Sequence, residues 1–185
     1  MANDLIELAR KSISAVFEHC DVSVDEIAHK YGGLQGVFVT LTIHGELRGC
    51  IGFAEPIFPL YEGVIKASQA AAFEDPRFPR LQKEELKDVR IEISVLSKPE
   101  LIRVKKPEDY LKQIKIGKDG LIIRGKMGSG LLLPQVFAKY NCTAEQALEM
   151  VCQKAWLQTD AWKDLDNKVF KFQARIIKEG EAAEH

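Results

Sequence analysis

The sequence predicts a single α+β domain, an antiparallel sheet with flanking helices, and three observations support this prediction. Segments with alternating apolar residues outnumber the long helical segments, neighbouring strands follow each other as hairpins, and a regular strand–helix–strand repeat is absent. The 185 residues are enough for one core, and 46% of them are hydrophobic. We expect one domain over residues 1–185 with a frayed tail from about residue 179, where large apolar side chains are missing.

The first predicted element is a helix that begins near Asp4. Asp4 and Glu7 have the spacing of a capping box, and apolar residues then recur three and four positions apart from Leu5 to Cys20. Because Cys20 continues this apolar stripe, we expect its side chain in the core. A hairpin follows, formed by residues 36–43 and 47–53 around the turn sequence His44-Gly45.

The register of this hairpin has two solutions, and they differ in where Cys50 points. A two-residue turn sets Cys50 opposite Val39, on the apolar face of the sheet. A three-residue turn sets Cys50 opposite Thr40, on the other face. Turn chemistry favours the first register and the apolar pattern favours the second, so the sequence leaves both open.

The remaining elements follow from alternation, from prolines at helix starts and from a capping box at Thr143 and Gln146. We interpret Trp156 and Trp162 as packing residues. In chain order the predicted elements are a helix over 60–73, a short helix near 83–86, a strand over 89–96, a short helix over 107–114, a hairpin around 118–120, a glycine-rich loop at 125–130, helices over 134–140 and 143–156, and a terminal strand over 169–177.

The composition argues against several classes of protein. The net charge is -1, whereas a nucleic-acid-binding protein usually carries a basic excess. No apolar run approaches the roughly 18–20 residues that cross a bilayer, so we expect no membrane partner. The four cysteines form no C-x-x-C pair, and the first residues lack the pattern of a signal peptide. We therefore expect free thiols, no metal site and a cytoplasmic protein.

Cys50 is the strongest candidate for a chemical role, with Arg48 as its partner. Two glycines, Gly49 and Gly52, bracket Cys50, and glycine within a strand often marks a bulge or the close approach of a ligand or backbone. Strand alternation places Arg48 and Cys50 on one face. A guanidinium there would favour the thiolate and could hold an anionic substrate. His44 cannot be the base for Cys50, since six strand residues separate them by about 20 Å.

Two further segments supply candidate ligand-binding residues. Asp75, Arg77 and Phe78 bring a carboxylate, a guanidinium and an aromatic ring to the end of a helix, although a capped helix with an internal ion pair explains them equally well. Ser129 and Gly130 belong to the glycine-rich loop, whose backbone N–H groups could cradle an anion. A hairpin connection is the simpler interpretation of that loop.

Four segments together resemble the AMMECR domain family, in its prokaryotic single-domain form. They are Leu47-Arg48-Gly49-Cys50-Ile51-Gly52, Asp75-Pro76-Arg77-Phe78, residues 129–136 (SGLLLPQV) and Cys152-Gln153-Lys154-Ala155. The resemblance extends from about Leu5 to Ile177, and Trp156 stands where the family pattern has glycine.

The resemblance implies a larger and a smaller subdomain with a cleft between them, and a presumed functional site at Arg48, Gly49, Cys50 and Gly52. It implies neither a known activity nor a metal or cofactor, and it associates the family with Memo-like and radical-SAM proteins. From it we expect an enzyme, or a component of an enzyme complex, that binds a small ligand, for which Arg48 favours an anion. The alternative is a non-catalytic module that binds a ligand or a protein partner.

Overall fold

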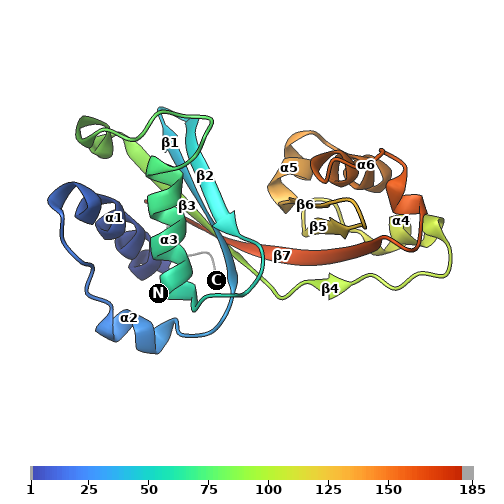
Figure 1. The fold of residues 1–185 in the computed structure, drawn as a ribbon, viewed down its shortest axis with the longest axis horizontal. Coiled ribbons are helices and arrows are strands. Elements are labelled where there is room, and N and C mark those ends of the chain that lie inside the picture. Colours follow the sequence, from blue (N-terminus) through green and yellow to red (C-terminus); the bar gives the residue numbers. More distant parts are fainter. Residues whose placement is uncertain (1, 181–185) are drawn as a thin grey trace. The chain divides into compact units, whose positions relative to one another are not determined.

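The structure, a computed structural model, describes residues 2–180 and divides into two compact units (Figure 1). The first unit comprises Met1–Leu96 and Arg175–His185, and the second comprises Ser97–Ala174. The described strand pairs are antiparallel, and helices pack on the sheet in each unit. This confirms the predicted α+β class.

The first unit is a sheet covered on one face by two helices. Strand β1 lies in the middle, between β2 and β3, and α1 and α3 pack on each other and on the sheet (Figure 1). Alternate residues of β1, Val37, Val39 and Leu41, are fully buried beneath the helices, as the period-two pattern predicts. The elements of this unit are α1 (Ala2–Glu18), α2 (Asp25–Lys30), β1 (Gly36–Ile43), β2 (Glu46–Phe53), α3 (Leu60–Phe73), the 3-10 helix η1 (Lys83–Lys87) and β3 (Val89–Leu96).

The second unit has its own core between a small sheet and the helices α5 and α6. Strand β5 lies between β6 and β7, and β4 pairs with β7. Thr143 and Gln146 form the predicted capping box at the start of α6. The elements of this unit are β4 (Glu100–Leu101), the 3-10 helix η2 (Pro107–Asp109), α4 (Tyr110–Gln113), β5 (Asp119–Arg124), β6 (Ser129–Leu132), α5 (Pro134–Lys139), α6 (Ala144–Lys154), the 3-10 helix η3 (Ala161–Lys163) and β7 (Lys168–Lys178), whose last residues belong to the first unit.

The β1–β2 hairpin combines the two registers that the sequence left open. Its turn has two residues, since Ile43 pairs with Glu46, yet Cys50 lies opposite Thr40. A β-bulge reconciles these facts, because the register shifts at Leu41 and Thr42 and makes Arg48 an extra residue on β2. The bulge turns Cys50 away from the helix-covered face.

Gly49 lies directly after the bulge and permits the close approach of α3. It pairs with buried Leu41, so it faces the helices. A Cβ atom on Gly49 would lie 2.0 Å from the carbonyl oxygen of Ala71, which is main chain and cannot rotate away. The glycine therefore sets the distance between β2 and α3.

Two sequence expectations fail because a residue with positive φ ends a helix. His19 has a φ of 52°, so α1 ends at Glu18 and Cys20 is exposed rather than in the core. Trp156, two residues after the end of α6, has a φ of 59° and is 95% exposed, so it is no packing residue, whereas Trp162 is buried as expected. The left-handed conformation at Trp156 is one that glycine adopts without strain.

Three smaller expectations are also corrected. Asp4 lies inside the first turn of α1, where it pairs with Lys30 instead of capping the helix. Strand β5 begins at Asp119, so residues 118–120 lead into a strand rather than forming a hairpin turn. The Asp119 carboxylate accepts a hydrogen bond from the Lys115 amide in the preceding turn. The glycine-rich loop is shorter than expected, since β6 begins at Ser129.

Glu179, the first residue of the expected frayed tail, is held in place by hydrogen bonds. Glu179 accepts two hydrogen bonds of 2.7 Å from the guanidinium of Arg10, and its amide donates to the carbonyl oxygen of Ile91. The rest of the predicted tail, residues 181–185, lies outside the described residues.

Substitution of Gly49 tests the close approach of β2 and α3. We expect Gly49→Ala to lower the free energy of unfolding by about 3 kcal/mol, because the new methyl group overlaps main-chain atoms. Gly33→Ala is the matched control, since a Cβ there meets nothing within 4 Å and the residue does not have a positive φ. Urea denaturation of both variants measures the difference, and equal stabilities would contradict this packing.

Candidate functional site

Cys50 occupies the outer face of β2, where a hydroxyl group contacts its sulfur. Its side chain is half-buried, and Thr40 Oγ1 donates a hydrogen bond of 3.3 Å to Cys50 Sγ. The amide and carbonyl of Cys50 bond to residues outside the hairpin, so Thr40 and Cys50 form a non-hydrogen-bonded pair, in which side chains approach most closely. The bulge thus brings a thiol and a hydroxyl together.

The ion pair of Asp75 and Arg77 holds the backbone of Cys50 at the free edge of β2. The Cys50 amide donates to Asp75 Oδ2 at 2.9 Å, and Arg77 Nη2 donates to the Cys50 carbonyl oxygen at 3.2 Å. The guanidinium also binds both carboxylate oxygens of Asp75, at 2.9 and 2.7 Å. These two side chains replace the neighbouring strand that an edge strand lacks.

The local sequence explains how Asp75 reaches this position. Helix α3 ends at Phe73, and Pro76 cannot continue a helix. The chain then turns, with the Phe78 amide donating to the Asp75 carbonyl oxygen at 3.1 Å, and the Arg77 amide donates to Asp75 Oδ1. The expected internal ion pair is therefore present, but the Asp75 carboxylate binds the turn after α3 and β2 instead of capping the helix.

Burial and charge distinguish the two members of this pair. The Asp75 side chain is 1% exposed and that of Arg77 is 54% exposed. The hydrogen bonds from Arg77, together with those from two backbone amides, hold the pKa of Asp75 far below its usual value. Asp75 in turn raises the pKa of Arg77, and a charge on Cys50 acts in the same direction. The guanidinium thus contacts both the Asp75 carboxylate and the backbone of Cys50.

Arg48 makes its contacts elsewhere, which corrects the expectation that it accompanies Cys50. Its guanidinium binds both carboxylate oxygens of Glu85, at 2.8 and 3.0 Å, and the carbonyl oxygen of Pro79 at 2.9 Å. Its side chain is only 12% exposed, and it lowers the pKa of Glu85. Strand alternation fails here because Arg48 is the extra residue of the bulge. Arg77, not Arg48, is the arginine that contacts Cys50.

The other predicted site residues have identifiable neighbours. A Cβ atom on Gly52 would lie 2.2 Å from the Val37 carbonyl oxygen, so the partner strand occupies the space that a ligand was expected to use. The Phe78 ring lies 5.5 Å from the Arg77 guanidinium. Ser129 and Gly130 belong to β6 in the second unit, where a Cβ on Gly130 would lie 2.6 Å from the Ala155 nitrogen, at the end of α6.

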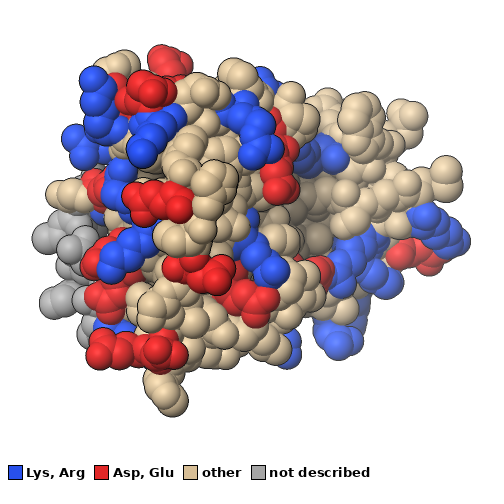
Figure 2. Space-filling view, turned by 60° about the vertical axis from the view of Figure 1, so that its left-hand side comes forward, with Lys and Arg blue, Asp and Glu red and all other residues tan. Residues whose placement is uncertain are grey.

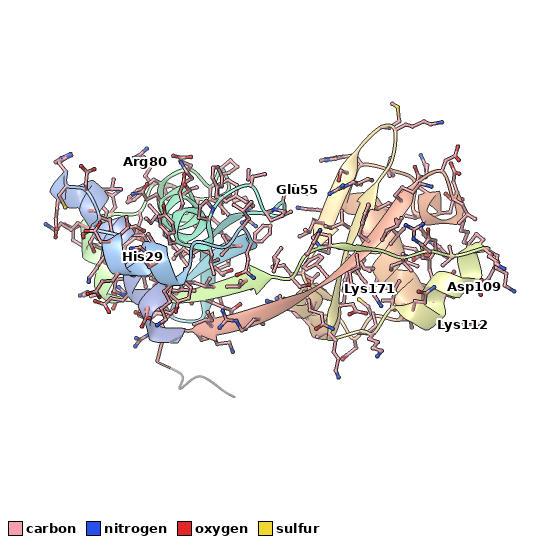
Figure 3. All side chains as sticks on the ribbon, turned by 90° about the horizontal axis from the view of Figure 1, so that it is seen from below. His29, Glu55, Arg80, Asp109, Lys112 and Lys171 are labelled. Atoms are coloured by element: carbon pink, nitrogen blue, oxygen red, sulfur yellow. The ribbon has the colours of Figure 1, made fainter. Side chains whose placement is uncertain are left out.

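Among the described residues, no histidine makes a hydrogen bond to Cys50, Asp75 or Arg77. His44 is in the hairpin turn, and His29 lies exposed on α2 (Figure 3). Within residues 4–180, no group of three or more histidine, cysteine or acidic side chains could hold a metal ion. Sequence reasoning placed Thr40 opposite Cys50 in only one of its two registers, and it missed Glu85, because the neighbours of the bulge are known only once the register is known.

The described surface carries mixed charge. Lysine and arginine side chains are interspersed with aspartate and glutamate on the face that Figure 2 shows. Among the described residues, none of the helices has both the length and the apolar character needed to cross a bilayer.

Replacement of Asp75 tests the role of the buried carboxylate. We expect Asp75→Asn to lower the free energy of unfolding by about 2–3 kcal/mol at pH 7, because charged hydrogen bonds to Cys50 and Arg77 are lost. The folded-state pKa of Asp75 lies below its unfolded value of about 3.9, so the stabilisation is complete above that pH and is lost as the pH falls below it. The difference between wild type and variant should therefore shrink below about pH 4.

Asp166→Asn provides the control, since Asp166 is 76% exposed in its ion pair with Lys126. We expect it to change stability by less than about 0.5 kcal/mol. Urea denaturation of all three proteins across the pH range gives the comparison. A wild-type advantage over Asp75→Asn that grows below pH 4 would contradict the assignment.

Comparison with known proteins identifies the family of this chain. The model of the AMMECR1 family matches residues 6–177. A protein of Nanoarchaeum equitans is 43% identical over 95% of this chain and 99% of its own length, and one of Thermococcus kodakarensis is 44% identical over 95% and 88%.

The crystal structure of an uncharacterised protein from Pyrococcus horikoshii is also similar, with a TM-score of 0.89 and 42% identity over 95% of this chain and 90% of that one. The names of these three relatives state no activity. The chain belongs to the AMMECR1 family.

Proposed function

We propose that the first unit carries a thiol-centred site for a small anionic molecule, in which Cys50 is the reactive group and Arg77 binds the anion. The protein would then act as an enzyme or as a component of an enzyme complex. The observation that carries the proposal is the joint contact at Cys50: the Thr40 hydroxyl on its sulfur and the Arg77 guanidinium on its carbonyl oxygen.

Thr40 and Arg77 have complementary effects on a thiol. A hydroxyl that donates a hydrogen bond to sulfur stabilises the thiolate more than the thiol, and a nearby cation does the same. The thiolate is the nucleophilic form of cysteine. These contacts support Cys50 as a nucleophile without a histidine.

Arg77 is better suited than Arg48 to bind the ligand. Its side-chain hydrogen bonds to Asp75 and Cys50 use Nε and Nη2. None of its hydrogen bonds within the described residues uses Nη1. With 54% of its side chain exposed, it can offer this nitrogen to a carboxylate or phosphate group. Arg48 would have to leave Glu85 first, at the cost of an unpaired carboxylate.

The proposal includes a cytoplasmic location for the protein. All four cysteines are free, and a reducing compartment keeps a reactive thiol available. A nucleic-acid substrate is disfavoured by the net charge of -1.

The second candidate is a module that binds a protein partner. Two large apolar side chains of the first unit are strongly exposed, Leu34 at 61% and Ile57 at 60%. Backbone bonds from Gln35 to Phe58 and from Leu60 to Gly33 hold their two segments side by side. Memo-like and radical-SAM proteins are the partners that the family resemblance implies. Cys50→Ser would leave this function intact and would abolish a thiol-based one.

A comparison of two alkylating reagents tests the anion-binding role of Arg77. Iodoacetate is negatively charged, iodoacetamide is neutral, and both react with the thiolate. The rate with iodoacetate divided by the rate with iodoacetamide is therefore independent of the thiolate fraction. We expect the iodoacetate-to-iodoacetamide ratio at Cys50 to be about fivefold higher in wild type than in Arg77→Gln, since one nearby unit charge contributes about 1 kcal/mol in water. Mass spectrometry of timed digests gives both rates from one sample.

Variants of Arg77 decide the interpretation. Arg77→Gln should therefore reduce the ratio at Cys50 about fivefold, and Arg77→Lys should keep it, because the charge is retained. Arg80→Gln is the matched control, as Arg80 is an exposed arginine three residues further along the chain. A ratio at Cys50 that is unchanged in Arg77→Gln would overturn the proposal.

A further inference from the structure

Three side chains of different chemistry meet at Cys50, and together they limit the reactions that its thiol can carry out. Thr40 Oγ1 donates to the sulfur at 3.3 Å, and Arg77 Nη2 donates to the carbonyl oxygen of the same cysteine at 3.2 Å. Asp75 Oδ2 accepts the hydrogen bond of the Cys50 amide at 2.9 Å. The thiol therefore has a hydroxyl and a guanidinium beside it, while its own amide is already used.

The use of the Cys50 amide argues against acyl transfer. A nucleophile that attacks a carbonyl group needs hydrogen-bond donors for the oxyanion, and its own amide is often one of them. Here the amide is bound to the Asp75 carboxylate, whose side chain is only 1% exposed and would be left with a buried, unsatisfied oxygen. Among the described residues, no histidine makes a hydrogen bond to Cys50, so a proton donor for the leaving group is missing as well.

Phosphoryl transfer is disfavoured for a related reason. The oxygens of a transferring phosphoryl group need several donors at once, which are often successive backbone N–H groups of a loop. Strand β2 does not offer such a set beside the sulfur. The amide of Cys50 is bound to Asp75, and the amides of Gly49 and Ile51 point to β1, because the bonds of an antiparallel pair alternate. The donors left for a reacting group are the Thr40 hydroxyl and the Arg77 guanidinium.

We propose that Cys50 reduces a hydroperoxide, which rests on the proposed function and narrows it to one class of substrate. The thiolate sulfur attacks the terminal peroxide oxygen, the S–O bond forms and the O–O bond breaks. The electron pair of the O–O bond leaves with the other oxygen, as an alkoxide or, from H2O2, as hydroxide, and an alkoxide then takes a proton from solvent. Sulfur is thereby oxidised to a sulfenic acid and the peroxide is reduced.

Thr40 and Arg77 match the movement of charge in this reaction. Negative charge begins on the sulfur, where the Thr40 hydroxyl bonds, and ends on the departing oxygen. Arg77 has 54% of its side chain exposed, and its bonds to Asp75 and Cys50 leave Nη1 for that oxygen. Donors that are in place before the reaction stabilise a developing charge without reorganisation. A hydroperoxide is also small enough to reach a half-buried thiol.

A second molecule has to reduce the sulfenic acid. Cys142 contacts Met150, Cys152 is buried and Cys20 is exposed, and within the described residues none of these three sulfurs contacts Cys50. The reductant is therefore a low-molecular-weight thiol. One such thiol displaces water from the sulfenic acid to form a mixed disulfide, and a second thiol attacks this disulfide and releases the Cys50 thiol.

Timed oxidation of the full-length protein by H2O2 tests this reaction. Mass spectrometry of digests follows the loss of the Cys50 thiol, and dimedone captures the sulfenic acid. The rate with H2O2 divided by the rate with neutral iodoacetamide gives a quotient that is independent of the thiolate fraction. We expect this quotient to fall about tenfold in Thr40→Val and in Arg77→Gln, because each variant loses a hydrogen bond to a charged group in the transition state. Iodide, the group that leaves from iodoacetamide, accepts hydrogen bonds poorly and depends little on these donors.

Two further variants complete the design. Thr40→Ser restores the hydroxyl that Thr40→Val removes, and the quotient should recover with it. Thr42→Val is the matched control, because Thr42 lies on the same strand opposite Leu47 rather than Cys50, and we expect the wild-type quotient. A quotient that is unchanged in Thr40→Val or in Arg77→Gln would overturn the peroxide reaction. The proposed function fails separately, through an iodoacetate preference at Cys50 that Arg77→Gln does not alter.

Discussion

The β-bulge at Arg48 is the constraint on which the candidate site depends. One extra residue on β2 lets a tight two-residue turn coexist with the pairing of Thr40 and Cys50. Without it, strand alternation would direct Cys50 into the core beside Val39. The bulge therefore determines whether the thiol can meet a ligand at all.

The bulge also explains why arginine and glycine surround the cysteine. Arg48, released from the alternating pattern, reaches Glu85 and ties β2 to η1. Gly49 then faces α3 at a distance that excludes any side chain. On the free edge of β2, the Asp75 carboxylate and the Arg77 guanidinium satisfy the backbone of Cys50. The family motifs around residues 47–52 and 75–78 are thus two halves of one hydrogen-bonded arrangement.

Much of the fold could be predicted from the sequence because its signals are local. The periods of two and 3.6 residues, the proline at position 59 and the Thr143 capping box each specify an element through its own neighbours. Helix ends were predicted less well, since His19 and Trp156 adopt a left-handed conformation that neither residue type favours. The residue types at these two positions therefore do not predict where the helices end.

The candidate site could be predicted only in part, for a physical reason. Cys50, Asp75 and Arg77 were identified by residue type, and the structure brings them together. The choice between Arg48 and Arg77 required the register, and a single bulged residue reverses every side chain beyond it. Thr40 could be named only as the partner of Cys50 in one of two registers, because the pairing of β1 and β2 decides which side chain lies opposite the cysteine.

Cross-strand disulfide formation tests the bulged register most directly. In a Thr40→Cys variant, the new thiol lies opposite Cys50 in a non-hydrogen-bonded pair, the geometry in which side chains are closest. We expect mild oxidation to join residues 40 and 50, seen by mass spectrometry of unreduced peptides, and we expect Val39→Cys to remain unlinked to Cys50. A disulfide between residues 39 and 50, with none in Thr40→Cys, would contradict the register and the site built on it.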